Sequence, residues 1–506
     1  MFKFKKGKKK QFGPVITMII LTFIIVLLSL IFSLFGITGT RTIIAGDSLE
    51  TSLITVKNVL TKEGFTFMFT SIVDNFQNFR PLILLVISLI AISIGEASGL
   101  FKAVFRKFKR LNPKFLTFLV LLTGIFSSFF GEYSYIFLLP LIAVIYKEIG
   151  RKPLLGILTI FLGITIGYGT GLIFNNEAII LSHLTEQAAR VDVDKNFTYS
   201  LTGNMSIMIV STFIIAIVGT FIIHGVLDKK IPKSTYEEAD ELIYSRKGLL
   251  YSTIAFFVML LAVVYMIIPR LPGSGILLGE GESYVERLFS DASPFYQGFT
   301  FIILWVMMIC GCIYGYASGN IKNSTDYSVA MSKNFEGLGY VFVLLFFASQ
   351  LIGLLEWTNL GTVIATIIVN FISSISLTGI LLIIVFFISI VLISILIPSA
   401  ITKWEIVSPL LVPLMMRSNV TPTFTQFVFR AADSIGKSIT PFFAYYIITL
   451  AFLEKYNTKE NTKITVFGTL RIVLPTVLLF AILWLGILII WYAAGLPTGI
   501  GMRPTF

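Results

Sequence analysis

The sequence predicts an all-α polytopic membrane protein with about nine transmembrane helices and two re-entrant helical hairpins. Of its 506 residues, 56% are hydrophobic and only 13% are charged, whereas roughly 25% of the residues of a soluble domain are charged. Several apolar runs contain about 20 residues, the length that spans a bilayer core of about 30 Å. Other apolar runs are interrupted by polar residues, which are tolerated at membrane depth only where protein buries them. These three observations predict the fold class.

Six apolar runs have the length of one crossing. The first follows the basic segment MFKFKKGKKK. It is too long for the apolar region of a cleaved signal peptide, so we interpret it as a retained helix. The six predicted crossings are residues 14–36, 81–104, 202–227, 248–268, 296–317 and 467–493.

Five further apolar stretches are interrupted. Residues 114–148 contain SSFFGEYS and residues 378–416 contain PSAITKWE, so we predict that each is a re-entrant hairpin returning to the side that it left. Residues 153–185 and 422–454 are each predicted to be one broken crossing. Residues 335–374 are predicted to pair a crossing with a shorter helix, separated at EWTNLG. The last three stretches complete the count of nine crossings.

The basic residues predict the orientation of the chain. With a cytoplasmic N-terminus and an extracellular C-terminus, 26 of the 39 Lys and Arg residues fall in cytoplasmic segments, in agreement with the positive-inside rule. The net charge of +12 therefore describes topology and gives no reason to expect a nucleic-acid partner. We expect a multi-pass protein of the plasma membrane, the inner membrane of a bacterial cell. Lys403, Arg430 and Lys437 instead lie at polar interruptions within the membrane.

The two hairpins and the broken helices that follow them form an internal repeat. Four residue pairs align at a constant offset of 269 residues, namely Tyr135 with Trp404, Pro140 with Pro409, Pro153 with Pro422 and Gly167 with Gly436. One predicted hairpin opens to the cytoplasm and the other to the outside, so the repeat is inverted. Inverted repeats with broken helices are typical of secondary transporters, which bind substrates and ions at the repeat interface. We therefore expect a secondary transporter.

These features divide the chain into seven segments. They are a basic cytoplasmic N-terminus (1–13), N-terminal scaffold helices with an outer loop (14–112), the first repeat (113–228), a linker with connecting scaffold helices (229–334), a helix leading into the second repeat (335–377), the second repeat (378–496) and a C-terminal tail (497–506).

Ionisable side chains at membrane depth are costly, so they mark candidate functional positions. Glu132 lies at the first hairpin tip, and Asn175 and Glu177 follow the first helix break. Arg430 and Asp433 are three residues apart and could pair on one helical face. Alternatively, Arg430 binds a substrate carboxylate while Asp433 orients it or takes a proton. The second hairpin and its broken helix add Ser399, Thr402, Lys403, Trp404 and Lys437.

Trp404 has two interpretations, because an indole ring at a hairpin tip could stack on an aromatic substrate or simply pack. Cys310 and Cys312 lie two residues apart in an apolar run and are interpreted as core residues. The sequence has no P-loop and no zinc-hydrolase motif. We therefore expect no cofactor, no bound metal and no enzymatic activity, and an ion channel is the alternative from another functional class.

The chain resembles the AbgT family, the p-aminobenzoyl-glutamate transporters, over nearly its whole length. This resemblance implies nine transmembrane helices, two re-entrant hairpins, a homodimer and the architecture of an elevator-type ion transporter. It also implies transport of small carboxylated aromatic compounds such as p-aminobenzoyl-glutamate, or proton-driven efflux of sulfonamide-type antimetabolites. The segments that carry the resemblance are GEASGL (95–100), LTGIFSSFFGEYSYIFLLPLIAVI (122–145), GITIGYGTGLIF (163–174), EWTNLG (356–361), ITKWEIVSPLLVP (401–413) and FRAADSIGKSITP (429–441).

The family's functional Trp, Pro, Arg and Asp residues of the second unit are all present in this chain. The resemblance places them at Trp404, Pro409 or Pro413, Arg430, Asp433 and Pro441.

The first unit and two lysines depart from the family pattern. Glu132 and Glu177 stand where the family has Asp, Lys437 replaces an Asn and Lys403 replaces a Gln. An amide oxygen can bind Na⁺, whereas a lysine ammonium has no acceptor and can take the place of a cation. We therefore expect coupling to H⁺ in preference to Na⁺, with Lys403 and Lys437 paired with Glu132, Glu177 or Asp433.

Overall fold

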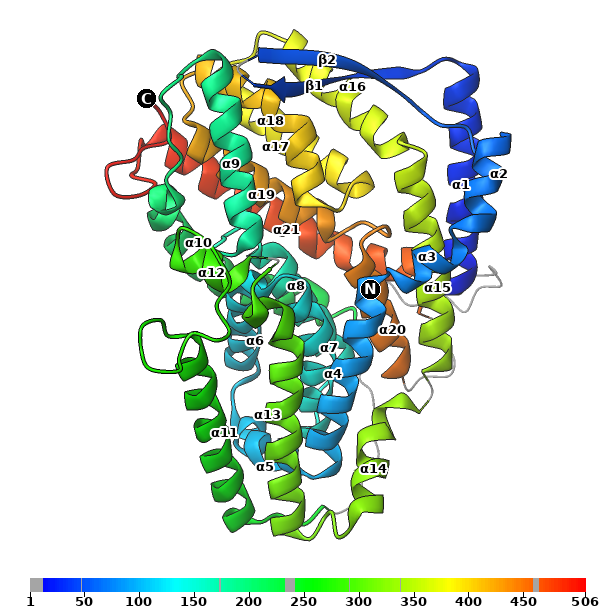
Figure 1. Cartoon of the computed structure of the whole chain (residues 1–506), viewed down its shortest axis with the longest axis vertical. Coiled ribbons are helices and arrows are strands. Elements are labelled where there is room, and N and C mark those ends of the chain that lie inside the picture. The colour runs from blue at the N-terminus through cyan, green and yellow to red at the C-terminus, as the bar shows by residue number, and fades with distance from the viewer. Residues whose placement is uncertain are drawn as a thin grey trace.

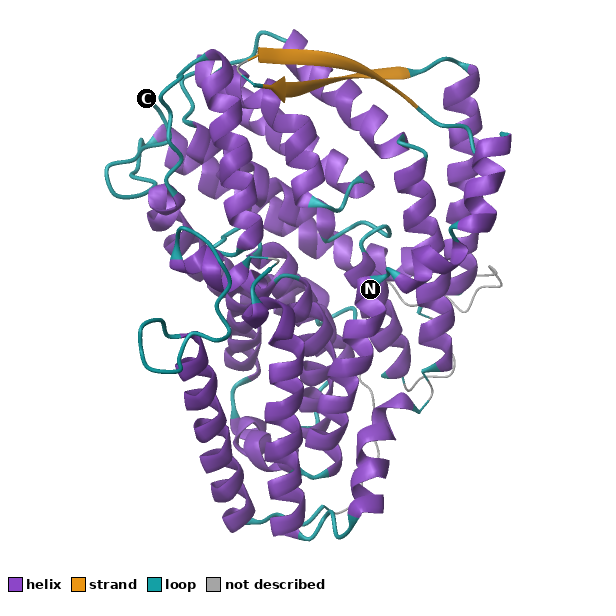
Figure 2. Ribbon diagram, viewed as in Figure 1, coloured by secondary structure: helices purple, strands orange, loops and turns teal. Residues whose placement is uncertain are grey.

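The computed structural model describes residues 12–46, 48–172, 174–232, 242–290, 292–336, 338–457 and 464–506. Most of the basic segment 1–13 and the middle of the mixed-charge linker 229–247 lie outside the described residues. The described chain is almost entirely helical (Figures 1 and 2).

The described chain contains twenty-one α-helices. Those of the first half are α1 (Pro14–Leu34), α2 (Lys62–Thr70), α3 (Ile72–Gln77), α4 (Arg80–Ala97), α5 (Leu100–Phe105), α6 (Pro113–Ser127), α7 (Glu132–Glu148), α8 (Pro153–Gly167), α9 (Asn176–Asp192) and α10 (Met205–Ile222). Those of the second half are α11 (Arg246–Ile267), α12 (Tyr284–Phe289), α13 (Pro294–Ser318), α14 (Ser324–Ser332), α15 (Gly339–Trp357), α16 (Leu360–Ser374), α17 (Gly379–Leu396), α18 (Ala400–Arg417), α19 (Pro422–Lys437), α20 (Ala444–Lys455) and α21 (Val466–Ala493). Short helical turns are η1 (Arg106–Arg110), η2 (Ser128–Phe130), η3 (Leu201–Asn204), η4 (Ile223–Leu227) and η5 (Lys333–Phe335).

Nine helical segments of the described chain are long and apolar enough to cross a membrane. The number agrees with the prediction, but the set differs. It includes the first helix of each predicted hairpin, α6 and α17, and it omits the two broken crossings, whose halves are short. Length and apolar composition therefore support a multi-pass membrane protein, while the re-entrance of the hairpins stays a prediction.

The expected outer loop between α1 and α2 contains a β-hairpin, so the prediction of an all-α fold is wrong at this place. Strand β1 (Thr38–Ala45) pairs antiparallel with β2 (Ser48–Thr55), and Thr38 lies opposite Thr55. The β-branched residues of TRTII favour an extended backbone. The hairpin lies across one end of the molecule, over α16 and α18 (Figure 1).

The predicted crossing 81–104 is also interrupted. Helix α4 ends at Ala97, and Gly99 has a φ of +82° before α5 begins. Asn359 separates α15 from α16 in the same way, with a φ of +56°. The break predicted at EWTNLG is therefore confirmed, whereas the similar break at GEASGL was not predicted.

The two repeat units have the same order of elements, and their boundaries keep the offset of 269 residues. Helices α8 and α19 begin at Pro153 and Pro422, and α7 and α18 end at Glu148 and Arg417. Proline is well suited to the first turn of a helix, because the amide hydrogen that it lacks would be unpaired there. The same residue type therefore starts both helices at equivalent positions.

Glycine packing also repeats between the two units. A Cβ atom on Gly167 would lie 2.5 Å from the Ile125 Cα atom of α6. A Cβ atom on Gly436 would lie 2.4 Å from the Ser394 Cβ atom of α17. Positions 125 and 394 again differ by 269 residues, so each glycine lets a broken helix approach the first helix of its own hairpin closely.

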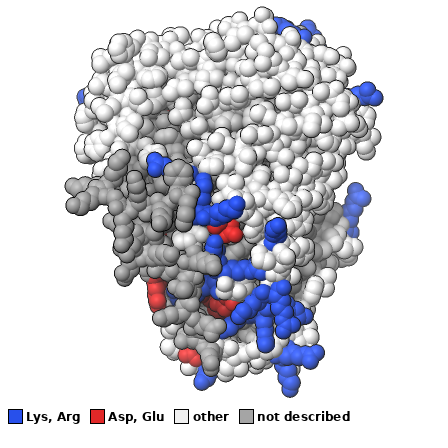
Figure 3. Space-filling view, turned by 180° about the vertical axis from the view of Figure 1, so that it is seen from behind, with Lys and Arg blue, Asp and Glu red and all other residues white. Residues whose placement is uncertain are grey.

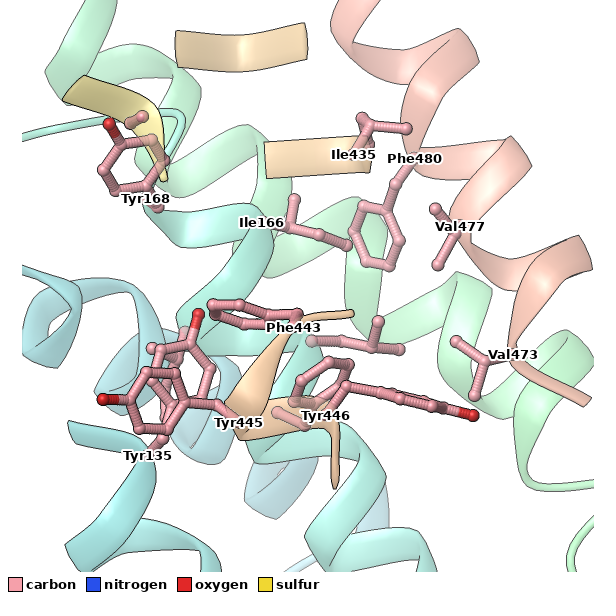
Figure 4. Packing of buried hydrophobic residues seen from close by; sticks show 14 of the residues in the cluster. Tyr135, Ile166, Tyr168, Ile435, Phe443, Tyr445, Tyr446, Val473, Val477 and Phe480 are labelled. Atoms are coloured by element: carbon pink, nitrogen blue, oxygen red, sulfur yellow. The ribbon is translucent and has the colours of Figure 1, made fainter. Parts of the chain in front are cut away.

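The second helix of each hairpin packs against the broken helix of the other unit. Helix α7 contacts α20, and α18 contacts α9. The Tyr135 ring of α7 stacks on the Tyr445 ring of α20 at a centroid distance of 4.8 Å (Figure 4). At the equivalent position of α18, the Trp404 indole N–H donates to Thr185 Oγ1 of α9 over 2.9 Å. This reciprocal packing brings both helix breaks into one buried region.

Basic side chains gather toward one end of the face drawn in Figure 3. The described segments predicted to be cytoplasmic include η1, whose sequence is RKFKR. Helices α5 and α14 lie at the end of the molecule opposite the β-hairpin (Figure 1). The side of the membrane that each end faces stays a prediction.

Candidate functional site

Helix α19 carries the charged centre of the molecule. Every one of its residues is buried, although the helix contains three ionisable side chains. Arg430, Asp433 and Lys437 follow each other at intervals of three and four residues, which places them on one face. A helix that is buried all round and still carries charge must find partners for that charge inside the protein.

Asp433 is the centre of a buried charge cluster. Its side chain is fully buried, and Lys403 Nζ of α18 contacts its Oδ1 atom directly. Lys437 Nζ lies 2.9 Å from Oδ2, and the Ser394 hydroxyl donates to Oδ1 over 2.8 Å. Two ammonium groups thus share one carboxylate, and the cluster formed by Lys403, Asp433 and Lys437 has one excess positive charge.

Arg430 does not pair with Asp433, so the first interpretation of their spacing is wrong. Its Nη2 atom donates to the Tyr168 carbonyl oxygen over 3.2 Å, and its guanidinium lies 5.0 Å from the centroid of the Tyr168 ring. Arg430 is only 7% exposed, and its Nε atom has no hydrogen-bond partner. Among the described residues, no carboxylate lies within ion-pair distance of this guanidinium.

The break between α8 and α9 supplies the other wall of this region. Tyr168 caps the end of α8, and its ring lies 4.1 Å from Lys437 Nζ. Its hydroxyl donates to Glu177 Oε1 over 2.7 Å. Gly171 has a φ of +60°, and a Cβ atom there would lie 2.5 Å from the Arg430 guanidinium. The glycine therefore lets the backbone of the break lie against the arginine.

Asn175 shapes the same break. Its Oδ1 atom accepts from the Ala178 amide over 2.9 Å and so caps α9. Its Nδ2 atom donates to the Phe129 carbonyl at the tip of the first hairpin over 3.0 Å. Asn175 thus holds the hairpin tip and the break together.

The tip of the second hairpin separates into exposed and buried residues. Ser399 and Thr402 are exposed, and Ser399 Oγ accepts from the Thr402 amide over 3.3 Å to cap α18. Trp404 is fully buried, with its ring centroid 4.3 Å from that of Phe429. Of the two interpretations of Trp404, this structure favours packing. The buried prolines of this unit are Pro409 and Pro413 within α18 and Pro441 in the break after α19.

Glu132 lies apart from the lysines, so the pairing expected for it is not formed. It begins α7, and its Oε2 atom lies 3.7 Å from Arg80 Nε of α4. Glu177 likewise binds Tyr168 instead of a lysine. Of the three carboxylates considered, Asp433 is the one that both lysines contact.

Tyr168 and Ser394 are the residues of this region that the sequence did not single out. Tyr168 contacts Arg430, Lys437 and Glu177, and so connects the charges of the two units. Its neighbourhood, GYGTG, was predicted only as a helix break. Ser394 could be found once α17 is known to pack on α19.

Comparisons with known proteins support one family. Residues 7–506 match the family described as "AbgT putative transporter family". The chain is 26% identical over 500 residues to the p-aminobenzoyl-glutamate transport protein of Escherichia coli, covering 97% of this chain and 94% of that protein.

Two solved structures are also similar. The YdaH transporter of Alcanivorax borkumensis has 25% identity, a TM-score of 0.47 and coverage of 96% of this chain and 100% of that one. MtrF of Neisseria gonorrhoeae, described as illuminating a class of antimetabolite efflux pumps, has 28% identity, a TM-score of 0.49 and coverage of 98% of both chains. On the family match across nearly its whole length, the chain belongs to the AbgT family of membrane transporters.

Proposed function

We propose that this chain is a secondary-active transporter of small carboxylated aromatic compounds such as p-aminobenzoyl-glutamate. The observation that carries the proposal is the buried guanidinium of Arg430, which no carboxylate of the described chain neutralises. A buried charge is unfavourable until it is paired, and a planar guanidinium binds a carboxylate through two parallel hydrogen bonds. A substrate carboxylate supplies that missing partner.

The coupling ion that we propose is H⁺. Both oxygens of Asp433 already face ammonium groups, from Lys403 and Lys437. A Na⁺ ion would have to displace one of them, because lysine offers a metal no acceptor atom. A proton can instead move within the cluster without new ligands.

The proposed motion is elevator-like, with the two hairpin units moving together against α4, α5, α15 and α16. The reciprocal packing of α7 on α20 and of α18 on α9 supports this division, because it ties the two units to each other. Alternating access around a site between repeats is the usual mode of inverted-repeat transporters. The proposal includes a homodimer in which the N-terminus of each chain is cytoplasmic.

Reconstitution in proteoliposomes tests this function. We expect p-aminobenzoyl-glutamate to accumulate above its equilibrium level when a pH gradient is imposed. Equal concentrations on both sides under the same gradient would indicate a channel and contradict the proposal. Reversing the gradient, and replacing the substrate by a sulfonamide, distinguishes uptake from efflux of antimetabolites.

Tyr168 is expected to position both the substrate-binding guanidinium of Arg430 and the ammonium of Lys437 in the buried charge cluster. Tyr168→Leu removes the ring that faces Arg430 and Lys437. Because a desolvated cation–π contact contributes about 2 kcal/mol, substrate affinity should fall at least about tenfold. Tyr168→Phe keeps the ring and removes only the hydrogen bond to Glu177. It should leave affinity nearly unchanged and shift the pH profile of uptake.

Titration calorimetry and uptake rates measured across pH check this prediction for Tyr168. Tyr284→Phe is the matched control, because Tyr284 is exposed and its hydroxyl donates only to the Ile267 carbonyl. A Tyr168→Leu variant that is folded and binds substrate normally would remove Tyr168 from the site.

A further inference from the structure

Helices α4 and α7 lie side by side (Figure 1), and an ion pair joins them at each end of their contact. At one end, Arg80 Nε of α4 lies 3.7 Å from Glu132 Oε2 of α7. At the other end, Glu96 Oε1 of α4 lies 3.0 Å from Lys147 Nζ of α7. The Arg80–Glu132 pair joins the first turns of the two helices, and the Glu96–Lys147 pair joins their last turns. The two helices are therefore parallel.

The charges of α4 are opposed by its own dipole. A helix has partial positive charge at its N-terminus and partial negative charge at its C-terminus. Arg80 occupies the first turn of α4 and Glu96 the last, where each is unfavourable for α4 itself. Glu132 and Lys147 have the favourable arrangement in α7. The charges of α4 are therefore explained by their partners on α7.

The spacing of the two ion pairs fixes the position of α7 along the axis of α4. The charged residues are 16 positions apart in α4 and 15 positions apart in α7, which correspond to about 24 Å and 22 Å. Both pairs can therefore form at the same time. A shift of α7 along α4 by one helical turn, about 5.4 Å, would separate both.

The Glu96 end is the more strongly held of the two. Glu96 is 7% exposed, whereas the Arg80 and Glu132 side chains are 55% and 41% exposed, and exposed pairs contribute little. Glu96 Oε2 also accepts from Asn334 Nδ2 over 3.1 Å. Lys455 of α20 donates to the Asn334 carbonyl over 2.8 Å. This end therefore connects α4 with helices of both hairpin units.

We propose that the Arg80–Glu132 and Glu96–Lys147 pairs form a two-ended lock that holds the hairpin units at one height along α4. The units move only when both pairs open together. The lock rests on the elevator-like motion proposed above, and it adds the contacts that such a motion has to break.

Distances between spin labels in the full-length protein in nanodiscs test the lock without substrate. The labels are attached at Phe115→Cys on α6 and Leu250→Cys on α11, both exposed positions, after Cys310 and Cys312 are replaced by Ala. Labelled chains are diluted with unlabelled chains, so that only distances within one chain are read.

Glu96→Gln and Lys147→Met should each increase the population of a second distance about tenfold or more, since each leaves a charge without its partner. The double variant should add little to either single change, as expected for residues that act as a pair. Lys147→Arg keeps the charge and should keep the original distribution. It therefore shows whether the charge at position 147 is what keeps the distance.

The Lys152–Asp228 pair provides the matched control. Its atoms are 2.6 Å apart, and both residues belong to the first repeat unit. Lys152→Met and Asp228→Asn should leave the label distances unchanged. Unchanged distances in Glu96→Gln and Lys147→Met, or an equal shift in the control variants, would overturn the lock. Failure of the unmutated protein to accumulate substrate in proteoliposomes would instead contradict the proposed function, and the two failures are therefore distinguishable.

Discussion

Replacing Arg430 by glutamine is expected to weaken substrate binding strongly and to impair transport while the protein stays folded. The change removes a buried cation that makes one hydrogen bond, to the Tyr168 carbonyl, and has no carboxylate partner among the described residues. The folded protein loses this bond and the contact with the Tyr168 ring, but it no longer buries an unpaired charge. The substrate loses charge-assisted hydrogen bonds of about 1.5–3 kcal/mol each, so its Kd should rise about 10- to 100-fold or more. Titration calorimetry on the purified variant measures this change.

Arg190→Gln is the control for Arg430. Arg190 is a surface residue of α9 that pairs with Glu186 over 2.6 Å, and its side chain is 44% exposed. Its replacement should leave binding unchanged. An Arg430→Gln protein with unchanged affinity would place the substrate elsewhere. Asp433→Ala is a poorer test of the same site, because it leaves Lys403 and Lys437 buried without their shared carboxylate.

Most helix breaks could be predicted because each interrupts an apolar run with residues that lipid excludes. GYGTG ends α8, and SITP follows α19. The repeat could be predicted for a related reason. Few other residue types start a helix as well as proline or allow packing as close as glycine does. Pro153 and Pro422 therefore mark the equivalent starts of α8 and α19.

Partner choice could not be predicted, because it depends on which helices meet. Lys403 and Asp433 are thirty residues apart and are joined only because α18 folds back beside α19. Glu132 was assigned to the same cluster on charge alone. In the structure it begins α7 on the side that faces Arg80. Sequence patterns give the face of a helix but not the neighbour of that face.

Aromatic residues were the hardest to interpret. Tyr168 lies in an apolar sequence in which a tyrosine is ordinary, and its role follows from contacts with three charged side chains. Trp404 drew attention because of its place near a hairpin tip, yet it is fully buried and hydrogen-bonded to Thr185. An aromatic ring is suited equally to packing and to binding, and only its surroundings distinguish the two.

Substrate accumulation by the unmutated protein is expected to respond to a pH gradient and not to a Na⁺ gradient. The Lys437→Asn change is expected to remove the response to the pH gradient. Lys437 and Lys403 face the two oxygens of Asp433. Without Lys437 the cluster becomes one lysine with one carboxylate, and it loses one of the two ammonium groups that can release and rebind the coupling proton. Accumulation driven by the pH gradient should fall at least about tenfold, the effect of losing about 1.4 kcal/mol. Exchange of labelled for unlabelled substrate should continue, because Arg430 is untouched.

The Lys403→Gln/Lys437→Asn double variant tests which ion is coupled to transport. It removes both ammonium groups from Asp433 and adds two amide oxygens, the kind of ligand that hard cations prefer. Accumulation by this variant should therefore respond to a Na⁺ gradient, while Lys114→Asn, a change at the start of α6, should leave coupling unaltered. Strict dependence of the unmutated protein on Na⁺, with no response to pH, would refute proton coupling. A double variant that transports but responds to neither gradient would show that the two lysines do not occupy the place of a cation.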